Sequence, residues 1–310
     1  MKKMFLGLAS LLLIGGLVSC SSKHEDSYTL DIASPGGAPG IAISTLLTDY
    51  QDEYKYNIGL EPTALPALFT KKEKDVIIAP INMGAKMYKK NSGYTLGAVV
   101  TWGNLYFASQ AKNFKLEDIN DKELVIFGEG TINESIINNV LENKNITPSK
   151  ITKLGDAKAT QQQLIADNEG SKVFVVAEPS LTMAKLKKDT INSLSIQDLY
   201  KEVSGSDGFA QAGCFINVNT INEHKTVVTK FLTRLSDSID FTKTNASKAS
   251  ENAVALGLFP KADPLIKAIP NCNIMYKSAL DSKPAIEGLV KLNAKDFGGA
   301  KPEDSFYYEG

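Results

Sequence analysis

The residue types that most often perform chemistry in proteins are scarce in this chain. Arg234 is the only arginine, and His24 and His224 are the only histidines. Arginine binds carboxylates and phosphates through paired hydrogen bonds, and histidine is a frequent general base and metal ligand. Both histidines lie outside the loops that we predict to bind a ligand, and no nucleophile is grouped with a base. We therefore expect no catalytic residues, no cofactor and no metal site.

Cys20 is the exception, because its surroundings predict a specific modification. A short basic start precedes an apolar run from Phe5 to Val18, which is shorter than the roughly twenty residues needed to cross a bilayer. The run ends in the letters LVSC, which resemble the lipobox of bacterial lipoproteins. The resemblance implies that residues 1–20 are a cleaved signal, that Cys20 carries lipid, and that residues 21–27 are a tether. The alternative is a plain signal peptide with an accidental cysteine.

Composition and length narrow the class further. Hydrophobic residues make up 43% of the chain and charged residues 22%, which is typical of a globular protein with a packed core. The net charge of −1 comes without a basic block, so we expect no nucleic acid partner. A length of 310 residues favours two lobes. Cys214 and Cys272 could pair as a disulfide in an exported protein or stay two separate buried thiols.

The most informative positions are loops between a predicted strand and a predicted helix. A strand from Tyr28 to Ala33 leads into the glycine-rich loop Ser34–Gly40, and apolar residues at helical spacing begin at Ile43. Similar turns follow later strands. Ligands in α/β folds bind beyond the carboxyl ends of strands, where helix starts point free N–H groups. We therefore expect ligand contacts from Gly37, Ala38, Pro39, Asn82, Trp102, Asn104, Gly130, Thr131 and Glu178.

Strands and helices alternate along most of the chain. Short apolar runs predict buried strands, and apolar residues at helical spacing predict the helices between them. The alternation predicts an α/β protein with parallel sheets. The predicted strands are 28–33, 56–60, 75–79, 94–101, 105–109, 124–127, 151–154, 173–177 and 213–218. The clearest predicted helices follow Thr131, which forms a capping box with Glu134, and cover 159–166, 227–239 and 245–256.

Five stretches together resemble a known group of proteins. They are SPGGAPGIA from Ser34, DVIIAPINMGAKMY from Asp75, LVIFGEGTINESII from Leu124, VFVVAEPSLTMAK from Val173 and QAGCFINVN from Gln211. In order and spacing they resemble the type II periplasmic binding proteins of ABC importers, in the branch that binds nitrate, sulfonates, taurine and thiamine precursors.

The resemblance implies a two-lobed α/β fold in which two strands cross between the lobes. One lobe would hold residues 28–107 and 212–310, and the other would hold residues 108–211. It also implies a monomeric extracytoplasmic receptor that binds a small molecule between its lobes and delivers it to ABC permease subunits. A surface lipoprotein for adhesion or signalling is the alternative function, and an enzyme on the same fold is a more distant one.

The residue types at the expected site leave two kinds of ligand open. Without arginine, a site for an amino-acid carboxylate is disfavoured. An oxyanion could be held by the N–H groups of two helix starts. A polar heteroaromatic ring could instead stack on Trp102 and donate hydrogen bonds to Glu178, and we favour this ligand if Glu178 faces the cleft. Each of these residues also has a plain structural alternative, since Trp102 could be core, and Asn82 or Glu178 could belong to a helix start.

Overall fold

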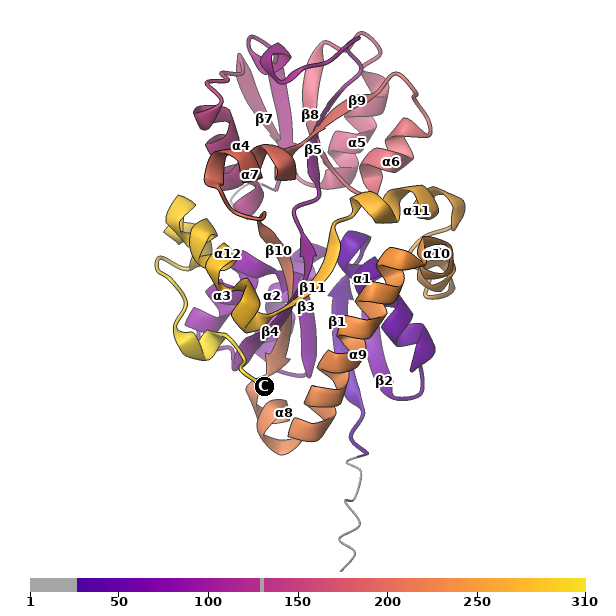
Figure 1. The fold of residues 1–310 in the computed structure, drawn as a ribbon, viewed down its shortest axis with the longest axis vertical. Coiled ribbons are helices and arrows are strands. Elements are labelled where there is room, and N and C mark those ends of the chain that lie inside the picture. Colours follow the sequence, from indigo (N-terminus) through magenta and orange to yellow (C-terminus); the bar gives the residue numbers. More distant parts are fainter. Residues whose placement is uncertain (1–26, 129–130) are drawn as a thin grey trace, which may run out of the picture.

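The chain divides between two β-sheets that stack end to end (Figure 1). The computed structural model describes residues 27–128 and 131–310, so the signal, Cys20 and Gly130 lie outside the described residues. The first sheet contains β1 (Leu30–Pro35), β2 (Tyr54–Leu60), β3 (Val76–Pro80), β4 (Tyr94–Trp102), β10 (Ala210–Asn217) and β11 (Ile274–Ser278). The second contains β5 (Leu105–Ser109), β6 (Glu123–Phe127), β7 (Lys150–Leu154), β8 (Lys172–Ala177) and β9 (Asn192–Ser195).

Both sheets mix parallel and antiparallel pairs. The first sheet has the order β11-β4-β10-β3-β1-β2, in which β1 is parallel to β2 and β3, and β10 lies antiparallel between β3 and β4. The second sheet has the order β7-β6-β8-β5-β9, in which β6 is parallel to β7 and β8. The strands β3, β6 and β8 are buried on both faces, which explains their continuous apolar sequences.

Helices cover both faces of each sheet, and we call each sheet with its helices a lobe. The first lobe contains α1 (Gly37–Asp49), α2 (Leu65–Lys71), α3 (Ile81–Lys89), α8 (Val218–Glu223), α9 (Lys225–Thr244), α10 (Ala246–Ala255), α11 (Asp263–Ala268) and α12 (Ala279–Leu292). The second contains α4 (Ile132–Asn143), α5 (Ala157–Ala166), α6 (Ser180–Lys185) and α7 (Ile196–Ser204). Short 3-10 turns are η1 (Pro62–Ala64), η2 (Leu116–Ile119), η3 (Ile269–Asn271), η4 (Ala294–Phe297) and η5 (Asp304–Phe306).

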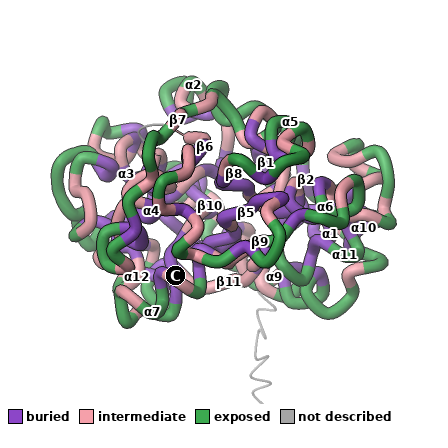
Figure 2. The backbone as a smooth tube through the Cα atoms, turned by 90° about the horizontal axis from the view of Figure 1, so that it is seen from above, coloured by how far each residue is buried: buried purple, intermediate pink, exposed green. Residues whose placement is uncertain are grey.

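The hydrophobic core is continuous from one lobe to the other on one side of the sheets. Trp102, Leu105 and Phe209 belong to the same buried cluster, which also includes side chains of α4 and α12. A second cluster lies under α1 and α9 in the first lobe, and a third lies under α5 and α6 in the second lobe. Seen from above, the buried positions gather along the centre and the exposed positions around the rim (Figure 2).

The chain passes between the lobes twice. It leaves the first sheet after Trp102 and enters the second at Leu105, and it returns between α7 and β10 through residues 205–209. We call residues 103–104 the first crossing segment and residues 205–209 the second. The boundary at 107/108 expected from the sequence therefore falls inside β5, because β5 pairs with β8 and β9 along its whole length.

The predicted α/β class with two lobes is confirmed, and several element boundaries differ. The first helix begins at Gly37 instead of Ile43, so the expected glycine-rich loop forms its first turn. Proline is tolerated in a first turn, since the N–H groups there have no partner within the helix. The elements β9, α7, α8, α11 and β11 were not expected from the sequence. The strands β9 and β11 have at most five residues, which is too short for a clear apolar pattern.

Candidate ligand-binding site

The carboxyl ends of the parallel strands in the two lobes face each other. In the first sheet Pro80 at the end of β3 pairs with Ala212, which in turn pairs with Thr101 near the end of β4. In the second sheet Ala177 at the end of β8 pairs with Leu105 at the start of β5. Because only residues 103–104 separate β4 from β5, the ends of β3 and β8 lie on opposite sides of the same junction. Ligands of open α/β sheets bind at such strand ends.

Two helices of the first lobe begin at this junction without a side-chain cap. Gly36 before α1 and Pro80 before α3 make no side-chain capping hydrogen bond. The first N–H groups of a helix have no partner within it, and the helix dipole places positive charge there. Of the predicted contacts in α1, Ala38 is buried, whereas Gly37 and Pro39 are half-buried. The two helix starts can therefore offer hydrogen-bond donors to an electron-rich group.

Thr131 begins α4 on the facing side, at the end of β6. Its hydroxyl oxygen accepts a hydrogen bond from the Asn133 N–H at 3.3 Å, so Thr131 caps the helix as predicted, although the bond comes from Asn133 instead of the Glu134 N–H that a capping box uses. The same hydroxyl donates to the Gly128 carbonyl at 2.6 Å. Thr131 is half-buried, and its hydroxyl is engaged with the backbone of its own helix start. Its predicted neighbour Gly130 lies outside the described residues.

Asn82 lies in the first turn of α3 and has no hydrogen-bond partner. The residue is only 4% exposed, its amide oxygen is sealed from solvent, and no hydrogen bond joins its side chain to the described part of the chain. An unpaired buried polar group costs about 1–3 kcal/mol. The sequence analysis left open a capping role for Asn82, and the absence of such a bond in the described residues favours a ligand-related role.

Asn104 ties the first crossing segment to the end of β8. Its Nδ2 donates to the Glu178 carbonyl at 3.1 Å, and its own carbonyl accepts from the Glu178 N–H at 3.0 Å. The backbone N–H of Asn104 donates to Oε1 of Gln211 at 3.1 Å, so β10 is joined as well. The remaining oxygen, Oδ1, is buried and unpaired. Asn104 therefore holds the junction together, and Gln211 is a polar member of it that the sequence analysis did not single out.

The carboxylate of Glu178 serves the start of α6. It accepts hydrogen bonds from the Thr182 N–H at 3.1 Å and from the Thr182 hydroxyl at 2.9 Å. Burial raises the pKa of Glu178, against these two bonds, which lower it. Burial, followed by the nearby Glu178 charge, also raises the pKa of the Tyr106 hydroxyl to about 12, and Tyr106 donates to the Asn271 carbonyl at 3.2 Å. The carboxylate thus has partners within the protein.

Trp102 is a core residue of the first lobe in this structure. It is 1% exposed, and its indole N–H donates to the Met275 carbonyl at 3.1 Å. The Lys277 ammonium lies over the ring, 4.8 Å from its centre. A ligand ring can stack on a tryptophan only if one face of the indole is open, so the alternative of a core role fits Trp102 better. Of the two features that favoured a heteroaromatic ligand, Trp102 is covered and Glu178 is engaged with Thr182.

The one arginine of the chain is paired, and its two body cysteines are buried. Arg234 donates to Glu53 at 2.6 Å, and its guanidinium lies 3.8 Å from the centre of the Tyr50 ring. Cys214 and Cys272 are separate buried thiols, as in the second alternative of the sequence analysis. Within residues 27–128 and 131–310, no three histidine, cysteine, aspartate or glutamate side chains gather as metal ligands.

A surface hollow of about 540 Å³ lies at a different place, near Tyr94 and Val218. Tyr94 begins β4 and Val218 follows β10, so this hollow lies at the ends of these two inner strands that are farthest from the junction. Its lining comes from helix ends and the C-terminal tail, and it is open to solvent. The junction, in contrast, brings together the strand ends, two uncapped helix starts and the Asn82 amide, which has no partner among the described residues. We therefore take the junction, and not the hollow, as the candidate site.

Solved structures with the same fold are numerous. A crystal structure described as an ABC transporter from Parabacteroides distasonis is 21% identical, with a TM-score of 0.77, and covers 91% of this chain and 99% of its own. A zinc-bound ligand-binding component of an ABC-type import system from Staphylococcus aureus is 14% identical, with a TM-score of 0.67, and covers 90% and 96%. The periplasmic aliphatic sulphonate binding protein of Escherichia coli is 14% identical, with a TM-score of 0.63, and covers 91% and 94%.

Sequence comparison adds no closer relationship, since no protein-family model and no curated protein matches the chain. At these low identities the structural likeness speaks for the fold alone. A further match, a Candida albicans protein at 12% identity and a TM-score of 0.56, is itself described as having the generic periplasmic binding protein fold, and it covers 90% of this chain and 93% of its own. The chain has the two-lobed fold of the periplasmic solute-binding proteins of ABC importers.

Proposed function

We propose that this protein is an extracytoplasmic solute-binding receptor that delivers a small molecule to an ABC importer. The observation that carries the proposal is the junction itself, where uncapped starts of α1 and α3 and the unpaired Asn82 amide meet the strand ends of the second lobe. Such a junction can enclose a small polar molecule between two lobes that move relative to each other. Similar structures that are described as sulphonate-binding or import components support this reading.

We further propose that the ligand carries an oxyanion. Helix starts supply N–H donors and positive dipole ends, which suit sulfonate, nitrate or related groups. The heteroaromatic alternative depended on an open Trp102 ring and a free Glu178 carboxylate, and both side chains have other partners. Enzymatic activity and adhesion have no specific observation in their favour.

The proposed attachment to the membrane rests on the sequence around Cys20. The first described residues, Ser27 and Tyr28, precede β1 at the base of the first lobe, away from the junction (Figure 1). Lipid on Cys20 would therefore hold the base of the first lobe near a membrane and leave the junction accessible to solute. In the described part of the chain, none of the helices combines the length and apolar character needed to cross a bilayer. We propose that the protein acts as a monomer beside its permease.

A thermal-shift screen tests the proposed function directly. The purified protein is heated with sulfonates, nitrate, pyrimidines and amino acids, each at a series of concentrations. A solute at one hundred times its Kd stabilises the folded protein by about 2.7 kcal/mol. We expect a concentration-dependent rise in Tm with at least one oxyanion. Stabilisation by pyrimidines alone would contradict the oxyanion class but not the receptor, and no stabilisation by any transported solute would contradict the receptor itself.

A further inference from the structure

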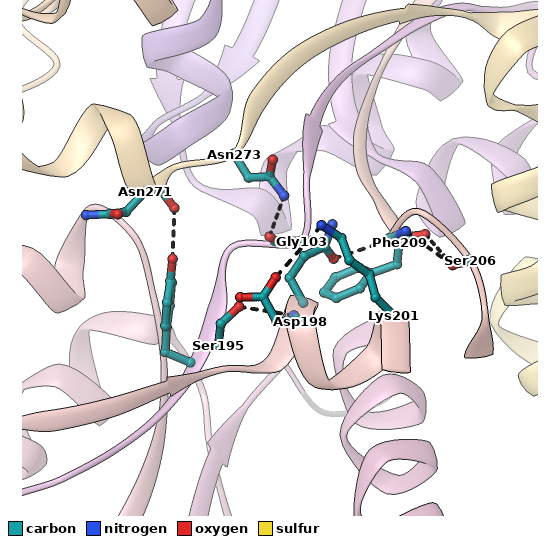
Figure 3. A network of polar contacts seen from close by, with 11 residues as sticks. Gly103, Ser195, Asp198, Lys201, Ser206, Phe209, Asn271 and Asn273 are labelled. Carbon is teal, nitrogen blue, oxygen red and sulfur yellow. Dashed lines mark hydrogen bonds and ion pairs between the residues drawn. The ribbon is translucent and has the colours of Figure 1, made fainter. Parts of the chain in front are cut away.

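The two crossing segments are bonded directly to each other and to the first lobe. The N–H of Gly103 in the first segment donates to the carbonyl of Phe209 in the second at 2.9 Å. The carbonyl of Gly103 accepts from Nδ2 of Asn273, which precedes β11, at 3.0 Å (Figure 3). Because the chain passes between the lobes only through these segments, any change in the angle between the lobes must alter their backbone.

Gln197 of the second lobe lies between the two crossing segments. It stands in the first turn of α7, is buried, and accepts a hydrogen bond from the Phe209 N–H at 3.2 Å. A methyl group added at Gly103 would overlap the Gln197 amide and the Phe209 ring. A methyl group added at Gly208 would overlap the same amide. Gly103 and Gly208, which are more than a hundred residues apart in the chain, therefore both leave room for the Gln197 side chain.

The position of Gln197 is fixed by its own helix and by the second segment. Ser195 caps α7 by accepting from the Asp198 N–H at 3.1 Å (Figure 3). Ser206 closes a turn in the second segment, where its hydroxyl donates to the Gly208 carbonyl at 3.0 Å and accepts from the Gly208 N–H at 3.2 Å. Gln197 is thereby held from the second lobe against a loop that leads into the first.

We propose that Gln197 is the positioning residue of the hinge, an inference that rests on the proposed receptor function. Its amide fills the space between Gly103 and Gly208 and so sets how closely the two crossing segments approach. Closure of the lobes rotates the backbone at these segments, and glycine allows rotations that other residues resist. With the amide in place, the segments keep their direct Gly103–Phe209 hydrogen bond and rotate together, because neither glycine can move into the volume of the amide. The residue therefore limits the range of angles between the lobes.

A variant series on the full-length protein tests this role without any ligand. Gln197→Ala empties the space, and Gln197→Glu keeps the shape and an oxygen that can accept from Phe209. Gln110→Ala is the matched control, because Gln110 is also a buried glutamine of the second lobe but bonds to Leu164 and Thr190, away from the crossing segments. Small-angle scattering reports the spread of lobe angles, and hydrogen exchange reports the Gly103 and Phe209 amides.

The alanine variant at 197 should widen the distribution of lobe angles and speed exchange at Phe209 by about five- to tenfold, as expected for loss of one hydrogen bond. The glutamate variant should restore most of the protection, and the control should lower Tm without changing the scattering. The inference is overturned if Gln197→Ala lowers Tm as the control does but leaves the lobe angles and the Phe209 exchange unchanged. Because no solute is present, that result would leave the proposed receptor function standing.

A double-mutant cycle adds a second test that a purely structural role would not pass. Gly208→Ala places a methyl group against the Gln197 amide and should by itself shift the lobe angles. Gly208 has a φ of 139°, which alanine rarely adopts, and this strain is the same in both backgrounds. In the Gln197→Ala background only the overlap with the amide is absent, so the same change should shift the angles less. Equal shifts in both backgrounds would mean that the two residues are not coupled and would overturn the inference.

Discussion

Replacing Asn82 by leucine should stabilise the ligand-free protein and weaken solute binding. The amide is 4% exposed and has no hydrogen-bond partner in the described part of the chain, so its burial is uncompensated. Leucine has a similar shape, is favoured in helices, and has no polar atoms to desolvate. A residue that costs stability in the free protein is expected at a binding site, where an oxyanion can accept from Nδ2 of the amide and a donor elsewhere on the ligand can bond to Oδ1.

The expected magnitudes follow from the burial of this one amide. An unpaired buried polar group costs about 1–3 kcal/mol, so Asn82→Leu should raise the free energy of unfolding by about 1–2 kcal/mol. For a chain of this size that corresponds to a rise in Tm of roughly 2–3 °C. Loss of one hydrogen bond to the ligand should raise Kd by about five- to thirtyfold.

Denaturation and calorimetric titration measure the two effects separately. Asn252 provides a matched control, because it is also a 4% exposed asparagine on a helix of the first lobe. Its Nδ2 donates to the Thr45 hydroxyl oxygen at 3.4 Å, so Asn252→Leu should destabilise the protein and leave Kd unchanged. The titration uses whichever solute the thermal-shift screen identifies.

The reasoning about Asn82 would be refuted by one combination of results. If Asn82→Leu destabilised the protein as Asn252→Leu does, and Kd stayed the same, the amide would be a paired structural group. A stabilised protein with unchanged Kd would confirm the unpaired amide but place the ligand elsewhere in the junction.

Three further predictions concern the packing around the junction. Glu178→Gln should remove a pH dependence of stability, because burial raises the pKa of Glu178 in the folded protein. The stability contributed by the protonated carboxyl is fully present below the unfolded-state pKa of about 4.3 and is lost as pH rises through the higher folded-state pKa. The Tm of wild type relative to that of the variant should therefore be highest in acid and should fall as pH rises. Gly84→Ala should cost about 1–3 kcal/mol or more in urea denaturation, because a methyl group would overlap the Phe215 ring. Ser135→Ala removes two hydrogen bonds that join α4 of the second lobe to the first lobe, one to the buried Asp296 carboxylate at 2.6 Å and one from Asn293 at 3.2 Å. Stopped-flow measurements should show roughly five- to tenfold faster ligand release, and Tm should fall because the Asp296 carboxylate loses its partner.

Much of the fold follows from short-range sequence patterns. Continuous apolar runs predict β3, β6 and β8 nearly residue for residue, since both faces of these strands are buried. The long helix α9 follows from its apolar spacing. Short elements such as β9 and α11 escaped prediction, because their few residues carry no clear period and their partners lie far away in the chain.

The candidate site could be predicted in its loops but not in the roles of its side chains. The order of strands and turns indicated the loops near residues 37, 82, 104, 131 and 178. Whether a side chain in such a loop faces a ligand depends on neighbours from distant segments. Thr182 takes up the Glu178 carboxylate, and Met275 with Lys277 covers Trp102. The role proposed for Gln197 could not be predicted from the sequence, because Gly103 and Gly208 approach its side chain only in the folded protein, where the two crossing segments lie side by side.

By itself, the sequence predicted an export signal and determined the alternation of strands and helices and the scarcity of arginine and histidine, which are properties of residue type and local spacing. The tertiary structure decided which polar groups were left without partners. A polar side chain that is held by partners within the protein is less available to a ligand, and this depends on contacts between residues far apart in the chain. On this basis we propose that Asn82, whose side chain has no partner among the described residues, is better placed to recognise a solute than Trp102 or Glu178.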